Sequence, residues 1–108
     1  MTPGLEVKLF RVKRELRRIK QLSHAIEAER KKHASSQRLE NITSEREALT
    51  GVYMPAIDRL EPVDKSIILS FIKGETHADI GARLGYSEVG IRRRCESAFE
   101  LIASDIKW

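Results

Sequence analysis

Three consecutive arginines, Arg92 to Arg94, offer the clearest chemistry in this chain. A guanidinium group presents its N–H donors in a rigid plane, so one arginine can form two parallel hydrogen bonds to a guanine edge or a phosphate. On a helix, three consecutive residues spread over about 200°, so they cannot all serve one face. The helical spacing therefore assigns Arg92 and Arg93 to an outward face and Arg94 to its flank.

Residues on either side of this triplet could also contact the bases of DNA. A carboxylate such as Glu88 can accept a hydrogen bond from cytosine N4, and the methyl groups of Val89 can contact a thymine methyl. The candidates for base contacts are the residues of this helix that do not point inward: Ser87, Glu88, Val89, Arg92, Arg93 and Glu96. The alternative for Arg92 and Arg93 is an ordinary solvated helix surface.

Phosphate contacts are expected from residues beside this helix. Thr76 and His77 lie at the start of the preceding helix, where free backbone N–H groups and the helix dipole favour an anion. Arg94 on the flank, Lys73 and Arg83 are further candidates. The alternative for His77 is a plain surface position.

No residue pattern suggests catalysis or metal binding. The chain shows no Ser/His/Asp arrangement, no carboxylate pair and no phosphate-cradling loop, so we expect neither an enzyme nor a cofactor. Its one cysteine, Cys95, lies on an apolar helical stripe, where a free thiol behaves as a small hydrophobe. The three histidines have no metal-ligand spacing with Cys95, so we expect no metal site.

Three helices with recognisable ends are expected to position these side chains. Pro62 suits the first turn of a helix that ends at Gly74. Thr76 caps a second helix that ends at Gly85, and Ser87 caps the third. Helical spacing predicts the buried residues as Ile67, Ile68, Phe71 and Ile72, then Ile80, Leu84 and Ala78 or Gly81, then Ile91, Cys95, Ala98, Phe99 and Ile102. The chain is expected to be all-α.

The second and third of these helices match the description of a helix-turn-helix, because a three-residue turn with glycine joins them and the later one is basic on its outer face. The stretch GETHADIGARLGYSEVGIRRRCESAFELI resembles region 4 of sigma-70-type factors. The residues that fit the family pattern are Gly74, Thr76, Asp79, Ile80, Gly81, Leu84, Gly85, Ser87, Ile91, Arg92 and Ala98. The preceding LEPVDKSIILSFIKG is similar to another helix of that family, with Lys65 where arginine is usual. The resemblance covers about residues 57–104 and implies binding of double-stranded DNA, with the helix that starts at Ser87 in the major groove.

The chain departs from a full sigma factor in its N-terminal part. Nothing in it resembles the promoter-melting region, and a basic heptad helix stands in place of the sigma body. This architecture resembles the small late-gene transcriptional regulators of bacteriophages and prophages, the RinA/ArpU type. That resemblance implies binding near a phage promoter and activation of bacterial RNA polymerase. The competing function is a small DNA-packaging subunit, or a helix-turn-helix module that binds polymerase or another protein.

A long amphipathic helix is predicted from Leu5 onward. Apolar residues recur at steps of four and three and form a heptad seam at Leu5, Leu9, Val12, Leu16, Ile19 and Ile26. The seam predicts oligomerisation as a homodimer; the alternative is that this helix folds back onto the three-helix part in one core. The opposite face carries Arg11, Arg14, Arg17 and Arg18, either as a solvated surface or as a phosphate-binding stripe.

The chain is expected to divide into an oligomerisation or docking segment, residues 1–43, and a helix-turn-helix domain, residues 44–108. Ser44 and Glu47 have the spacing of a capping box, which predicts the start of a short helix. Gly51 and Pro55 in the stretch TGVYMP predict a break after it.

Charge and hydropathy point to a partner and a location. The net charge is +4, and residues 1–34 alone carry ten basic and four acidic side chains, which favours an anionic partner, nucleic acid first. No apolar run approaches the ~20 residues of a membrane span, and no secretory signal is visible. A single cysteine suits a reducing interior. We therefore expect a cytoplasmic protein of a bacterial or phage-infected cell, with no membrane partner.

Overall fold

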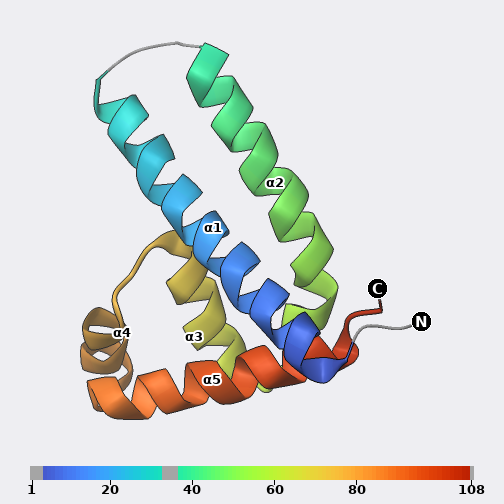
Figure 1. Ribbon diagram of the computed structural model, residues 1–108. Coiled ribbons are helices and arrows are strands. Elements are labelled where there is room, and N and C mark those ends of the chain that lie inside the picture. Colours follow the sequence, from blue (N-terminus) through green and yellow to red (C-terminus); the bar gives the residue numbers. More distant parts are fainter. Residues whose placement is uncertain (1–3, 33–36, 108) are drawn as a thin grey trace.

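The end signals in the C-terminal half of the chain produce three helices at the expected positions. In the computed structural model, which describes residues 4–32 and 37–107, α3 spans Pro62–Lys73, α4 spans His77–Leu84 and α5 spans Glu88–Asp105 (Figure 1). Gly74 and Gly85 end α3 and α4 in the left-handed conformation, with φ angles of 108° and 80°. All regular structure within the described ranges is helical, which confirms the all-α class.

Side chains cap the starts of α4 and α5 as predicted. Thr76 Oγ1 accepts a hydrogen bond from the backbone N–H of Asp79 at 3.1 Å. Ser87 Oγ accepts one from the backbone N–H of Gly90 at 3.0 Å. Each bond satisfies a backbone donor that the first turn of a helix leaves free, and such a cap is worth about 1 kcal/mol. The turn between α4 and α5 is therefore fixed at both ends.

Two longer helices form the N-terminal half, and the second corrects two of our predictions. Helix α1 spans Leu5–Lys31, as expected, and α2 spans Gln37–Asp58. Helix α2 runs through both Ser44 and Pro55. The helix start predicted at Ser44 and the break predicted at Gly51 and Pro55 are therefore both wrong. A proline inside a helix costs about 3 kcal/mol. Helix α2 tolerates Pro55 on its exposed side because the same turns bury Tyr53, Ala56 and Ile57.

A single apolar core joins all five helices. It contains Val12, Leu16 and Ile19 of α1 and Tyr53 and Ile57 of α2. From α3, α4 and α5 it contains most of the residues predicted to be buried there: Ile67, Ile68, Phe71, Ile72, Ile80, Ile91, Cys95, Ala98, Phe99 and Ile102. Leu84, also predicted, is only partly buried against the core, and of the alternatives Ala78 and Gly81 it is Gly81 that is buried. The expected boundary at residue 43 falls inside α2, and the core draws on both sides of it. Residues 5–31 are therefore part of the same packing unit as the helix-turn-helix.

The heptad seam of α1 faces the interior of this chain. Val12, Leu16 and Ile19 are fully buried and Ile26 is 8% exposed. Leu9 is partly buried against the core, whereas Leu5 is 53% exposed. Most of the seam predicted for a homodimer is thus used within the chain, because it packs into the core that α1 shares with α2, α3 and α5. The structure has the alternative arrangement, in which α1 folds back.

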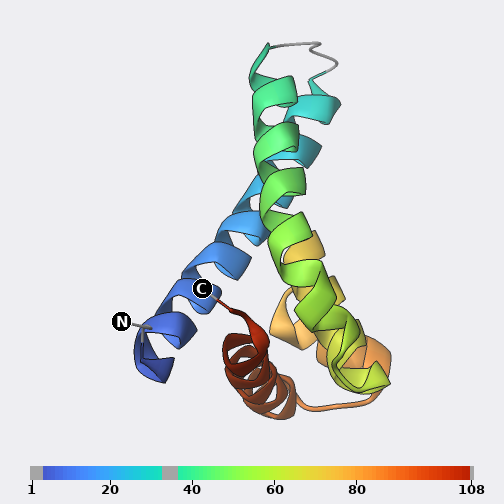
Figure 2. The same ribbon diagram turned by 90° about the vertical axis from the view of Figure 1, so that its right-hand side faces the viewer.

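Helix α1 lies diagonally across α3 and α5, and α2 runs back alongside it (Figures 1 and 2). Its first turn is tied to the end of α5, where Lys8 Nζ donates to the Ile106 carbonyl at 3.3 Å. From there α1 and α5 diverge, and α4 lies beside the N-terminal half of α5 (Figure 1). Helix α3 lies between the diverging helices and packs against both of them.

Candidate nucleic-acid interface

The turn between α4 and α5 is built around Gly81. Its carbonyl accepts hydrogen bonds from the backbone N–H groups of Gly85 at 2.8 Å and Tyr86 at 2.9 Å. A Cβ atom at Gly81 would lie 2.4 Å from the Tyr86 carbonyl oxygen, well inside contact distance. Residue 81 must therefore be small, because its close neighbour is the backbone of the turn. This contact sets the angle at which α5 leaves α4.

Helix α5 has one buried and one exposed face. Ile91, Cys95 and Phe99 point into the core, where the Phe99 ring meets the edge of Phe71 at 5.7 Å between centroids. The remaining sides of its first two turns, with the capping residue, expose Ser87, Glu88, Val89, Arg92 and Arg93. The structure thus brings five of the six predicted base-contact residues together on the exposed side of the first two turns.

The two arginines on this face differ in their contacts. Arg92 forms an ion pair with Glu88 one turn earlier, at 3.2 Å, but both side chains are more than half exposed. Such an exposed pair is worth at most about 1 kcal/mol, so it does not hold the guanidinium back from a ligand. Arg93 forms no ion pair or hydrogen bond within the described part of the chain. Both guanidinium groups are accessible from solvent.

Glu96, the sixth predicted base contact, is placed differently. Its carboxylate lies 2.6 Å from Lys13 Nζ of α1, and its side chain is 45% exposed. Because this pair joins α1 to α5, it positions the two helices relative to each other. The sequence around Glu96 could not predict this contact, because the contact depends on where α1 packs against α5.

Two of the predicted phosphate-contact residues are held by acceptors of this chain. The Arg94 guanidinium lies 3.4 Å from an Asp64 carboxylate oxygen and 4.8 Å from the centre of the Tyr86 ring. Arg83 donates to Ser70 Oγ at 2.5 Å and to Glu75 at 2.7 Å. Arg94 lies on a different side of α5 from Arg92, since two residues on a helix differ by about 200°. The arginine triplet is therefore divided as the helical spacing predicts.

The other three predicted phosphate-contact residues lie at the end of α3 and the start of α4. Lys73 is exposed in the last turn of α3. Thr76 is exposed, but its hydroxyl oxygen already serves as the cap of α4. His77 is half-buried and stacks on Phe71, with ring centroids 5.9 Å apart and an interplanar angle of 22°.

Cations from α1 and α5 lie near His77 of α4. Burial lowers the pKa of His77, and the positive charges of Lys20 on α1 and Arg92 on α5 lower it further, against the opposing effect of Glu88 and Glu96. Lys20 Nζ lies 4.7 Å from the centre of the Phe71 ring on which His77 stacks. A small pocket of about 110 Å³ opens here and is lined by Arg17, Phe71, His77, Arg92, Cys95, Glu96 and Phe99. Residues from α1 therefore take part in this surface.

The sequence indicates part of this arrangement only. Arg17 belongs to the basic face recognised on α1, but the heptad pattern alone does not place that face beside α5. Nothing in the sequence near Lys20 marks it as a neighbour of His77, because 56 positions separate them along the chain. Such a juxtaposition depends on the direction in which α1 folds back.

Cys95 is an inert part of the core. Its side chain is 1% exposed. Burial raises the pKa of the Cys95 thiol to about 11, so the reactive thiolate is scarce at neutral pH. Among residues 4–32 and 37–107, no group of three or more His, Cys, Asp and Glu side chains is arranged to hold a metal ion.

Comparison of the chain with models of known protein families found no match, and neither did comparisons with curated proteins and with solved structures. In the part of the chain that the structure describes, no helix has the length and apolar character that crossing a bilayer requires.

Proposed function

We propose that this protein is a sequence-specific DNA-binding transcriptional regulator of the phage type. One observation carries the proposal: α5 starts at a capped turn, buries Ile91 and Cys95 against the core, and exposes Arg92 and Arg93 on its first two turns. A rigidly held helix with exposed arginines near its N-terminus is what a major groove, about 12 Å wide, can admit.

Base reading is assigned to the exposed face of α5. Arg92 and Arg93 would each form a pair of hydrogen bonds with the O6 and N7 atoms of a guanine, and each good pair discriminates by about 1–3 kcal/mol. Arg92 would then exchange its weak ion pair with Glu88 for the guanine edge. Glu88, once released, can accept from cytosine N4, and Val89, 54% exposed, can contact a thymine methyl.

The start of α4 supports the same docking. Its first backbone N–H groups and the positive end of its dipole favour a phosphate oxygen near Thr76 and His77. The resemblance to sigma region 4 and to phage late-gene regulators supports a role in transcription, with bacterial RNA polymerase as a second partner. In this proposal the promoter DNA is the primary ligand.

A binding selection from random DNA duplexes tests the proposal. We expect enrichment of a short motif that contains guanine, and Arg92→Ala/Arg93→Ala should bind that motif at least tenfold more weakly and lose its preference over mismatched duplexes. The comparison variant is Arg83→Gln/Arg94→Gln, which removes the same charge from one position on α4 and one on α5. It should keep the sequence preference of the parent, because both of its arginines are held by acceptors of the chain.

Two results would contradict the proposal. Selection of no motif, or an unchanged preference in Arg92→Ala/Arg93→Ala, would show that α5 does not read DNA sequence. Assembly of the purified chain into a large ring would favour the DNA-packaging alternative, whereas a monomer or a dimer agrees with a regulator. Equilibrium sedimentation with and without the selected duplex measures this stoichiometry.

A further inference from the structure

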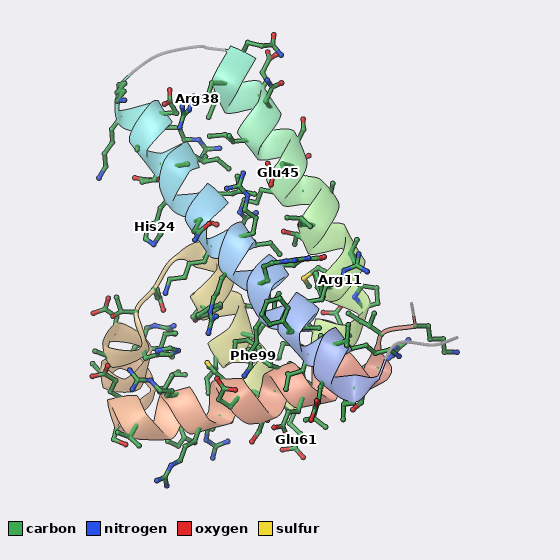
Figure 3. All side chains as sticks on the ribbon, in the orientation of Figure 1. Arg11, His24, Arg38, Glu45, Glu61 and Phe99 are labelled. Atoms are coloured by element: carbon green, nitrogen blue, oxygen red, sulfur yellow. The ribbon has the colours of Figure 1, made fainter. Side chains whose placement is uncertain are left out.

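The four arginines on the outer part of α1 differ in what they contact. Arg11 forms an ion pair with Glu15 at 2.7 Å, and Arg18 forms one with Glu45 of α2, also at 2.7 Å. Figure 3 shows Arg11 and Glu45 in the region between α1 and α2. These two arginines thus stabilise the side of α1 that faces α2.

Two other basic residues of α1 reach toward α4 and α5. Exposed Arg17 lies between the two sides of α1: it lines a pocket on the α2 side with Glu45, and it also lines the small pocket that Arg92 and His77 line. It forms no ion pair or hydrogen bond within the described ranges. Lys20 lies one turn further along α1, with its ammonium over the Phe71 ring. Figure 3 places Phe99, another residue of the pocket wall, where α1 approaches α5. Arg17 and Lys20 therefore border the same surface as Arg92.

We propose that α1 is a second DNA-contacting element, in which Arg17 and Lys20 bind backbone phosphates beside the groove that α5 enters. This inference rests on the proposed function, because α5 must be docked for α1 to reach the backbone. Two cations on one side of the base-reading helix can bind the regularly spaced, negatively charged phosphates of a DNA strand. Each such contact releases condensed counterions. Contacts of this kind fix the orientation of a protein on the duplex and read no sequence.

The angle between α1 and α5 is fixed by contacts at two points. Lys13 pairs with Glu96 at 2.6 Å, and Lys8 bonds to the carbonyl of Ile106. Leu16 is fully buried in the apolar core that α1 shares with α5, which anchors α1 against the other helices. The phosphate-binding residues are therefore held at a set distance from Arg92, so that the strand and the groove are engaged together.

The test compares two double variants of α1 in DNA binding. Arg17→Gln/Lys20→Met removes both cations and keeps an apolar stem over Phe71. The control, Lys31→Gln/Lys32→Met, removes the same charge from exposed positions about 20 Å further along the helix. Affinity for the selected duplex and for a mismatched duplex is measured over a range of salt concentrations, and circular dichroism verifies the helical fold of each variant.

We expect the salt dependence of Arg17→Gln/Lys20→Met to become shallower by about 1.8, since each phosphate contact contributes about 0.9 to the log–log slope. Its affinity should fall by a similar factor for both duplexes, and the control should match the parent. If the parent binds and Arg17→Gln/Lys20→Met keeps its slope, or if the control loses as much, the inference fails while the proposed function stands. If the parent selects no duplex, the proposed function fails and the inference with it.

Discussion

The molecule consists of a body, which holds the common core, and a distal pair, which is the far part of α1 and α2. The body contains α3, α4 and α5 with the adjoining turns of α1 and α2. The distal pair comprises residues 22–32 and 37–48, and Figure 2 shows it extending beyond the other helices. Among its described residues only Leu22 and Ile26 are buried, and both lie outside the common core.

The two regions are held together by different forces. Apolar burial dominates the body, where one fully buried leucine or isoleucine contributes about 1.5–3 kcal/mol. The ion pairs of the distal pair are largely exposed: Arg38 pairs with Glu29 within it, and Glu45 pairs with Arg18 of the adjoining turn of α1. All but one of these four side chains are more than 40% exposed. Exposed ion pairs contribute about 0–1 kcal/mol each. The distal pair should therefore open more readily than the body, and the proposed DNA-binding surface lies on the body.

The largest expected loss of stability is at Leu16, a residue of the α1 heptad seam that is buried in the body. Leu16→Asp puts a carboxylate where the parent side chain is fully buried, and an unpaired buried charge costs more than the total stability typical of a domain this small. We expect loss of cooperative unfolding and of most helical circular dichroism. A folded Leu16→Asp monomer from a dimeric parent would instead show that the seam joins two chains.

A matched pair of isoleucines on α1 compares the two regions directly. Ile19 is fully buried in the common core, whereas Ile26 is 8% exposed and lies outside it. Ile19→Ala should lower the free energy of unfolding by about 3–4 kcal/mol and Ile26→Ala by about 1–2 kcal/mol, because the looser site can close over the missing atoms. Urea unfolding measures both values. An equal loss at the two positions would remove the distinction between body and distal pair.

Local signals predicted α3, α4 and α5 well and α2 poorly. Gly74, Thr76 and Ser87 mark helix ends through backbone conformation and capping, which depend on neighbours only a few residues away. In α2 the local signals pointed to a break at Pro55, and burial of Tyr53 against the body outweighed them. A local penalty of a few kcal/mol cannot be compared with tertiary burial until the packing partner is known.

The sequence could predict only the part of the candidate site that lies on a single helix, α5. Helical spacing separates Arg92 from Arg94, because both positions are set by the geometry of α5 alone. The contact between Glu96 and Lys13 depends on α1 folding back. A heptad seam has the same pattern whether it packs on its own chain or on a second copy, so the sequence left both arrangements open.

Alanine substitutions at two helical glycines should change stability by smaller amounts and in opposite directions. Gly81→Ala in the body places its methyl group 2.4 Å from the Tyr86 carbonyl and should destabilise by about 1–3 kcal/mol through forced movement of the turn. Gly51→Ala on α2 meets no atom within 4 Å and should stabilise by up to about 1 kcal/mol, as alanine favours the helix. Thermal unfolding of the two variants gives the signs. Two changes of the same sign would contradict the close approach at Gly81.

The smallest expected effect is in the ion pair between α1 and α2. A double-mutant cycle on Arg18→Ala and Glu45→Ala should give a coupling energy of about 0.2–1 kcal/mol, since these side chains are 48% and 43% exposed. The coupling should weaken in high salt, because screening acts on exposed charges. Hydrogen exchange should quicken at the amides of residues 37–48 in either single variant and stay unchanged in α5. A coupling well above this range, or faster exchange in α5, would mean that the distal pair and the body open together, which the difference in burial argues against.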